Sequence, residues 1–180
     1  AAATGWALRV LAVPETLPKV LEYVRQRYQQ MLKAGSAAGV RGMSIDLLDR
    51  QLAQLAQFLG QARYAPADEA LRALVPRFRE RGMPPVYSPV RPETRAAAIW
   101  ALGLIHEGKG DAELADLVQE RLTGDGALGR DDPRVRRMAA VGLGLMGAKD
   151  FLPALRDYSD GAAPSADPVP NACRWAVGRL

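Results

Sequence analysis

The sequence predicts an all-α protein in which helical hairpins stack into a right-handed α-α superhelix. Three observations support this fold class. The segment 132–144 (DPRVRRMAAVGLG) has echoes at intervals of roughly 40 residues along the chain of 180. Hydrophobic residues recur every three or four positions, as on one face of a helix. Strand-like alternation of hydrophobic and polar residues is absent.

The repeat is visible when the chain is slid along itself. Shifts of 41, 34 and 43 residues each align similar segments. In the shift of 34 residues, the Asp-Pro pair at 167–168 stands one position out of register with the pair at 132–133. The aligned segments are 92–103 on 133–144, 175–178 on 141–144, and 68–75 on 111–118. Both halves of a two-part unit therefore recur.

Each unit is predicted to contain two helices. An Asp-Pro pair marks a helix start, because the Asp side chain accepts hydrogen bonds from free N–H groups and proline suits the first turn. The glycines that end the repeated segment, Gly103 and Gly144, indicate a helix stop. In the unit at about 44–81, apolar residues recur at helical spacing in both predicted helices. They are Ile45, Leu48, Leu52, Leu55 and Leu59 in the first helix, and Leu71, Leu74, Val75 and Phe78 in the second.

The units form one predicted repeat domain over residues 1–180. Residues 1–13 look like the end of a helix, the chain begins without methionine, and the last unit stops after one helix. Natural solenoid ends usually carry polar capping helices, so we expect a fragment of a longer protein. The approximate units are 1–35, 44–81, 92–122, 133–158 and a partial one at 168–180.

The segment 132–144 resembles the HEAT-repeat signature D-P-x-V-R-x-x-A-A-x-A-L-G, in the short form also found in phycobilisome lyases. The resemblance implies that Pro133 begins the first helix of a unit. It also implies that Arg136 pairs with an acidic residue of an adjacent repeat. Other copies depart from the signature, since Thr94 replaces the valine and Pro170 replaces the arginine. The residues implied to pack inside are Val135, Ala139 and Leu143.

The resemblance implies a scaffold without catalytic activity that binds another protein or another domain of its own protein. Two features suggest where. Long links between units fall on one rim, and the loop 82–92 contains four prolines that make it stiff and present Tyr87. The alternative, that this loop only wedges two repeats apart, stays open. The candidate contact residues are Arg72, Arg79, Tyr87 and Arg91.

The charge distribution suggests a second function. Residues 1–90 carry 12 Lys and Arg against 7 Asp and Glu, whereas residues 91–180 carry 12 against 13. Second helices usually line the concave face in the HEAT family, so this groove is expected to be basic early and acidic later. Nucleic-acid backbone binding is therefore an alternative, although simple solvation also explains the charges. The groove residues are Arg25, Arg27, Arg72 and Arg79, then Asp116, Glu120 and Asp157.

No catalytic or metal site is predicted, and no cofactor. His106 is the single histidine and is expected to be a helix-end residue. Cys173 is the single cysteine and is expected in the core, since free cysteine is commonly buried. A bilin lyase role is a minor alternative, because resemblance to a repeat is not resemblance to an activity. The expected location is cytoplasmic, without membrane insertion, because no apolar stretch approaches the roughly 20 residues of a spanning helix.

Overall fold

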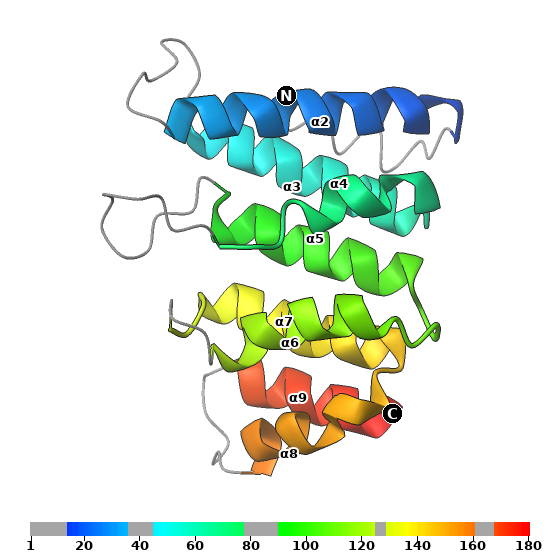
Figure 1. The fold of residues 1–180 in the computed structure, drawn as a ribbon, viewed down its shortest axis with the longest axis vertical. Helices are drawn as coiled ribbons and strands as arrows, with labels where there is room; N and C mark the ends of the chain where they lie inside the picture. Colours follow the sequence, from blue (N-terminus) through cyan, green and yellow to red (C-terminus); the bar gives the residue numbers. More distant parts are fainter. Residues whose placement is uncertain (1–13, 36–44, 78–89, 125–128, 161–167) are drawn as a thin grey trace.

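The computed structural model describes residues 14–35, 45–77, 90–124, 129–160 and 168–180. Within these ranges the chain forms helices and no strand, which confirms the all-α prediction (Figure 1). The α-helices are α2 (Leu17–Gly35), α3 (Ile45–Gln61), α4 (Asp68–Arg72), α5 (Pro92–Ile105), α6 (Ala112–Thr123), α7 (Pro133–Met146), α8 (Leu152–Asp160) and α9 (Pro168–Arg179). Short 3-10 helices are η1 (Pro14–Thr16), η2 (Ala65–Ala67) and η3 (Lys149–Phe151).

The helices form two layers that extend along the long axis of the molecule. Helices α3, α5, α7 and α9 pack side by side in chain order, and we call them the first-helix layer. Helices α2, α4, α6 and α8 form the second-helix layer, which faces the viewer in Figure 1. Helices α4, α6 and α8 each pack mainly on the first helix that follows in the chain. This arrangement is the predicted solenoid of stacked helical hairpins.

The first-helix layer is held together by glycines at helix crossings. A Cβ atom added to Gly60 of α3 would lie 2.4 Å from the Cα of Ala101 in α5. One added to Gly144 of α7 would lie 2.9 Å from the Cα of Ala176 in α9. Close backbone approach of this kind requires residues without side-chain bulk on both helices.

The predicted helix stops at Gly103 and Gly144 are wrong, because both glycines lie inside helices. Helix α5 continues to Ile105 and α7 to Met146. Helix α7 stops at Gly147, which has a left-handed φ of 74°. The N–H of Gly147 bonds to the carbonyl of Gly144, and the N–H of Ala148 bonds to the carbonyl of Leu143. The glycines in the repeat therefore serve packing rather than termination.

The second helix predicted around Leu71, Leu74, Val75 and Phe78 is much shorter than expected. Helix α4 ends at Arg72, and Phe78 lies outside the described residues. Leu74 and Val75 are fully buried but lie after the helix, in tight turns. Their N–H groups bond to the carbonyls of Leu71 and Arg72, three residues back in the chain. Pro76 explains the early end, since proline disfavours the helical conformation of the residue before it.

Among the described residues Arg136 has no acidic partner, so its implied ion pair stays a prediction. Its Nε donates to the carbonyl of Leu122 at 3.0 Å, and its guanidinium lies 5.2 Å from the ring centre of Tyr158. The equivalent arginine of the preceding unit, Arg95, does form the buried pair, with Asp131. The residues implied to pack inside behave as expected, because Val135, Ala139 and Leu143 are fully buried, and so is Cys173.

Candidate functional site

The structure describes two of the four candidate contact residues. Arg72 lies in α4 and Arg91 immediately precedes α5, whereas Arg79 and Tyr87 lie outside the described residues, as does most of the proline-rich loop. Arg91 forms an exposed ion pair with Asp46 of α3. Both described arginines are therefore engaged within the chain.

Arg72 belongs to a polar cluster that joins α4, the end of α5 and the start of α6. Its Nε lies 2.8 Å from Asp68, and its Nη2 lies 2.6 Å from Asp111. The ring of His106 lies between the same two carboxylates, 2.5 Å from Asp68 and 3.4 Å from Asp111. Asp111 also caps α6 by accepting the N–H of Leu114 at 2.9 Å.

This cluster is a structural tie between helices. The backbone N–H of Leu114 is the main cause that lowers the pKa of Asp111, partial burial opposes it, and Arg72 lowers it further. The described partners of His106 are the carboxylates of Asp68 and Asp111, with no serine, threonine or cysteine among them. Among the described residues no group of three His, Cys, Asp or Glu side chains is placed to hold a metal ion.

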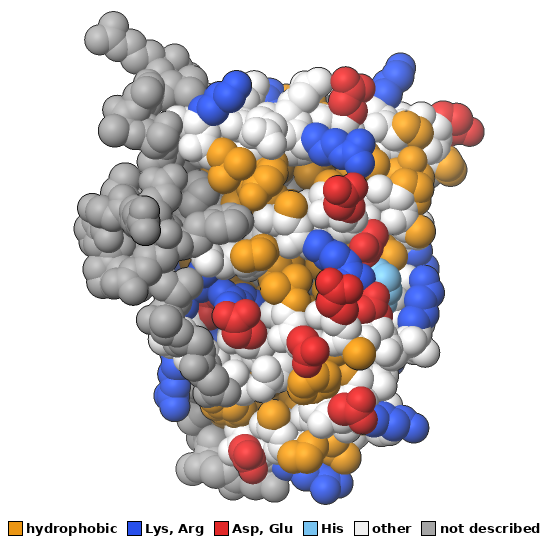
Figure 2. Space-filling view, viewed as in Figure 1, with side chains coloured by type: hydrophobic (Ala, Val, Ile, Leu, Met, Phe, Trp, Pro, Cys, Tyr) orange, Lys and Arg blue, Asp and Glu red, His pale blue; other side chains and the backbone are white. Residues whose placement is uncertain are grey.

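The second-helix layer presents a mixed surface. In Figure 2, which shows this side of the molecule, acidic and basic side chains alternate with small hydrophobic areas. Several groups of the predicted groove are paired, since Glu120 bonds to Arg121 and Arg27 bonds to Tyr23 and Gln30. The arrangement does not concentrate one sign of charge on the described part of this face.

The outward side of the first-helix layer has a different character, and sequence reasoning did not single it out. We call it the first-helix face. Solvent-accessible positions recur along α5 at Glu93, Trp100 and Leu104, and along α7 at Arg134, Arg137 and Val141, which is one side of each helix. The signal was present in the sequence as this spacing of larger side chains, but only the packing shows which side of each helix stays uncovered.

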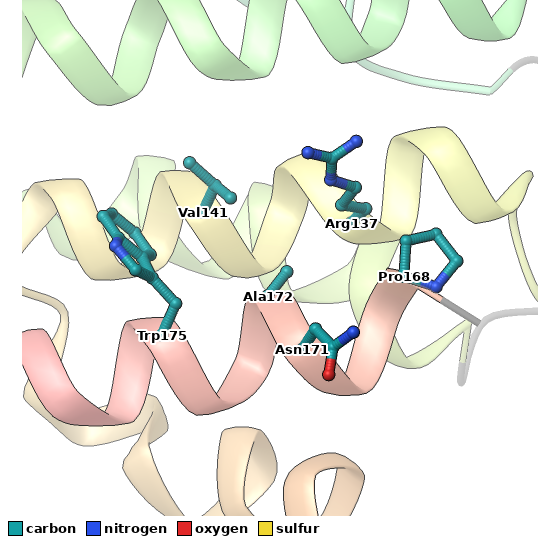
Figure 3. A pocket seen from close by; sticks show the side chains of 6 residues that line it. All are labelled: Arg137, Val141, Pro168, Asn171, Ala172 and Trp175. Carbon is teal, nitrogen blue, oxygen red and sulfur yellow. The ribbon is translucent and has the colours of Figure 1, made fainter. Parts of the chain in front are cut away.

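Two shallow grooves run along the first-helix face, each between neighbouring helices. The groove between α7 and α9 has a volume of about 500 Å3 and is drawn in Figure 3. The groove between α5 and α7 has a volume of about 330 Å3. The α7/α9 groove is lined by Arg137, Val141, Pro168, Asn171, Ala172 and Trp175. The α5/α7 groove is lined by Gln57, Glu93, Ala96, Ala97, Trp100, Arg134 and Met138.

A large apolar side chain is exposed on this face. Trp175 of α9 lines the α7/α9 groove and is 45% exposed. In Figure 3 the indole of Trp175 extends across the gap toward Val141, with Ala172 on the groove floor. A small residue at Gly144 is required under this indole, because an added Cβ would lie 3.1 Å from it.

The first-helix face also carries unpaired positive charge. Glu93 lies 3.6 Å from Arg134, which is the exposed acid–base contact of the α5/α7 groove. No ion pair joins the exposed Arg50 or Arg137 to another described residue. Guanidinium groups next to an exposed indole bind acidic groups and aromatic rings of other molecules.

Comparison with known proteins bears on the repeats directly. The family model for HEAT repeats matches residues 88–167. No curated protein and no solved structure matches the chain significantly. HEAT repeats are generally protein-interaction scaffolds and typically lack catalytic activity. No helix in the described ranges combines the length and the apolar character needed to cross a bilayer. With the repeated hairpins and the start of α7 capped by Asp132, this match identifies residues 88–167 as HEAT repeats.

Proposed function

We propose that the chain is a protein-binding module whose first-helix face binds a segment of another protein in which acidic residues stand beside large apolar ones. The groove between α7 and α9 carries this proposal, because it combines the exposed indole of Trp175 with the guanidinium of Arg137, which forms no ion pair with a described residue. Interaction sites in proteins are enriched in tryptophan and arginine for the same physical reasons.

The apolar part of the groove supplies the driving force. Burying an exposed indole removes apolar surface from water, at about 25 cal/mol for each Å2. The floor made by Ala172 and Val141 is small and flat, so an aliphatic or aromatic side chain fits against Trp175 without displacing a helix. A rigid first-helix layer keeps this geometry before binding, which reduces the entropic cost of association.

The charge of the face selects the partner. Arg137 and Arg50 lack ionic partners in the described part of the chain, and Arg174 donates to the side chain of Asn171 at 2.8 Å. An acidic partner segment is therefore attracted and a basic one repelled. The module needs no cofactor for this role.

The binding face is tested by site-specific photo-crosslinking. A benzoylphenylalanine replaces Asn171 in the α7/α9 groove, or Asp116 on the exposed side of α6 as a matched control. We expect crosslinks from position 171 to peptides that combine Asp or Glu with Leu, Ile or Phe. Crosslinks confined to position 116 would place binding on the second-helix layer and contradict the proposal.

The captured segment is then made as a synthetic peptide and its affinity is measured. Trp175→Ala and Arg137→Glu are each expected to weaken binding by about ten-fold or more. Tyr23→Ala is the matched control, because Tyr23 is an exposed aromatic residue of α2, away from the grooves. Equal weakening by all three variants would refute the assignment. Capture of nucleic acid that is lost as salt rises would favour nucleic-acid binding instead.

A further inference from the structure

A third pocket lies at the rim where α5 and α7 begin, apart from both grooves. Its volume is about 240 Å3. The residues that line it are Arg77, Arg91, Pro92, Arg95, Arg130, Asp131 and Asp132. Four guanidinium groups and two carboxylates thus line a space of small-molecule size. Of these, Arg91 also pairs with Asp46, and Arg77 donates to the carbonyl of Gly129 at 2.9 Å.

The two carboxylates of the pocket are already engaged. Asp131 bonds to Arg95, and its side chain is only 2% exposed. Asp132 caps α7 by accepting the N–H of Arg134 at 2.9 Å, and the Arg134 side chain contacts the same carboxylate. Both acids thus have partners, although the buried Oδ2 of Asp131 has no hydrogen bond and lies 3.8 Å from Arg121.

Arg95, in contrast, retains unused hydrogen-bonding capacity. The side chain of Arg95 is 5% exposed, and its buried Nε–H has no hydrogen-bond partner, although Nη1 donates to the carbonyl of Val90 at 2.6 Å. Arg130 is exposed and forms no ion pair with a described residue. An unsatisfied buried donor costs free energy, which a bound acceptor recovers.

The charges around the pocket favour an added anion. Arg121 lies 3.8 Å from Asp131, so a fifth guanidinium faces the same buried carboxylate. Burial is the main cause that lowers the pKa of Arg95; Asp131 opposes this, and the nearby Arg77 and Arg121 lower it further. An oxyanion in the pocket would relieve this repulsion between like charges.

We infer that this rim pocket binds an oxyanion group, a carboxylate or a phosphate, carried by a side chain of a protein partner. Planar guanidinium groups match both oxyanions in bidentate geometry. The described surroundings argue against a nucleic-acid strand, because Asp46 and Glu93 flank the pocket and interrupt any continuous basic track. The identity of the partner rests on the proposed function, whereas the oxyanion site itself does not.

The site is tested first by titration with inorganic phosphate, and binding is monitored by NMR of the arginine Nε–H groups. We expect saturable shifts of the Arg95 and Arg130 signals, and binding about ten-fold weaker in Arg130→Gln and Arg91→Gln. Arg25→Gln is the matched control, since Arg25 is an exposed arginine of α2 without a described ion partner. Shifts that do not saturate, or that weaken equally in Arg25→Gln, would overturn the oxyanion site whatever the first-helix face binds.

The source of the oxyanion is tested with three peptides that differ at one position, which is serine, glutamate or phosphoserine. Stronger binding of the glutamate or the phosphoserine peptide than of the serine peptide, lost in Arg130→Gln, supports the proposal and identifies the group. Binding of a DNA duplex tighter than that of any peptide, lost in the same variant, would overturn the protein source. Trp175→Ala is expected to leave phosphate binding unchanged, so the two proposals fail separately.

Discussion

The two layers of the molecule are held together by different forces. Neighbouring first helices meet through backbone atoms, with glycine at the crossing of α3 on α5 and of α7 on α9. Second helices are tied to one another by side chains: Arg72 of α4 bonds to Asp111 at the start of α6, and Tyr158 of α8 donates to the carbonyl of Thr123 at 3.2 Å. Steric fit therefore fixes the spacing of one layer, and replaceable polar contacts fix the other.

The largest effect is expected at the buried ion pair between α5 and the segment just before α7. Asp131→Asn leaves the guanidinium of Arg95 buried without its counter-ion, and removing one partner of such a pair typically costs about 3–5 kcal/mol. Urea unfolding followed by circular dichroism measures this loss. The exposed pair of Arg91 with Asp46 provides the control, because Asp46→Asn is expected to cost about 0–1 kcal/mol. Equal effects of both variants would mean that the buried pair contributes little.

The steric character of the first-helix layer is tested at its glycines. In Gly60→Ala the new methyl group would lie 2.4 Å from the Ala101 backbone, so α3 and α5 must move apart, at a cost of about 1–3 kcal/mol. Gly178 of α9 has no described atom within 4 Å of an added Cβ. Gly178→Ala is therefore expected to stabilise by up to about 1 kcal/mol, the helix preference of alanine over glycine. A stable Gly60→Ala protein would show that the layers do not differ in this way.

The polar ties of the second-helix layer are tested at Asp111. Asp111→Asn keeps a capping side chain but loses the charge that faces Arg72, so we expect a loss of about 1 kcal/mol at neutral pH. The pKa of Asp111 is lowered in the folded chain, so its contribution is complete above the pKa of the unfolded chain and disappears as pH falls through the lowered value. Thermal melts of both proteins from neutral to acidic pH measure the difference. A difference that persists in acid would exclude the charge as its source.

Local signals explain why much of the fold is predictable from the sequence. The starts of α5 and α7 are set by residues next to them in the chain, Pro92 in one case and the capping Asp132 before Pro133 in the other. These helix starts can be recognised from adjacent residues alone, without knowledge of residues that are distant in the chain. Helix α4 shows the limit, because Pro76 ends the helix while Leu74 and Val75 keep the burial that the periodicity predicts.

The candidate surfaces depend on contacts that the sequence does not reveal. Arg95 and Arg136 occupy equivalent positions of the repeat. Within the described residues, however, Arg95 bonds to the carboxylate of Asp131, 36 residues further along the chain, whereas Arg136 bonds to the carbonyl of Leu122. Likewise, the exposure of Trp175 follows from which side of α9 faces α7. Arginines were expected to act as free contacts, but packing commits Arg72 to its own neighbours.

The packing of α6 on α7, and of α8 on α9, has a consequence for how the chain divides into independent pieces. A hairpin cut at the boundary suggested by sequence similarity, such as α5 with α6, loses the helix that covers the buried side of α6. We therefore expect a piece that keeps α6 covered to contain at least three helices, a hairpin together with the helix that follows it. Exchange of one repeat for another consequently alters two interfaces. To transfer binding specificity, the residues at both junctions must therefore be exchanged together with the repeat.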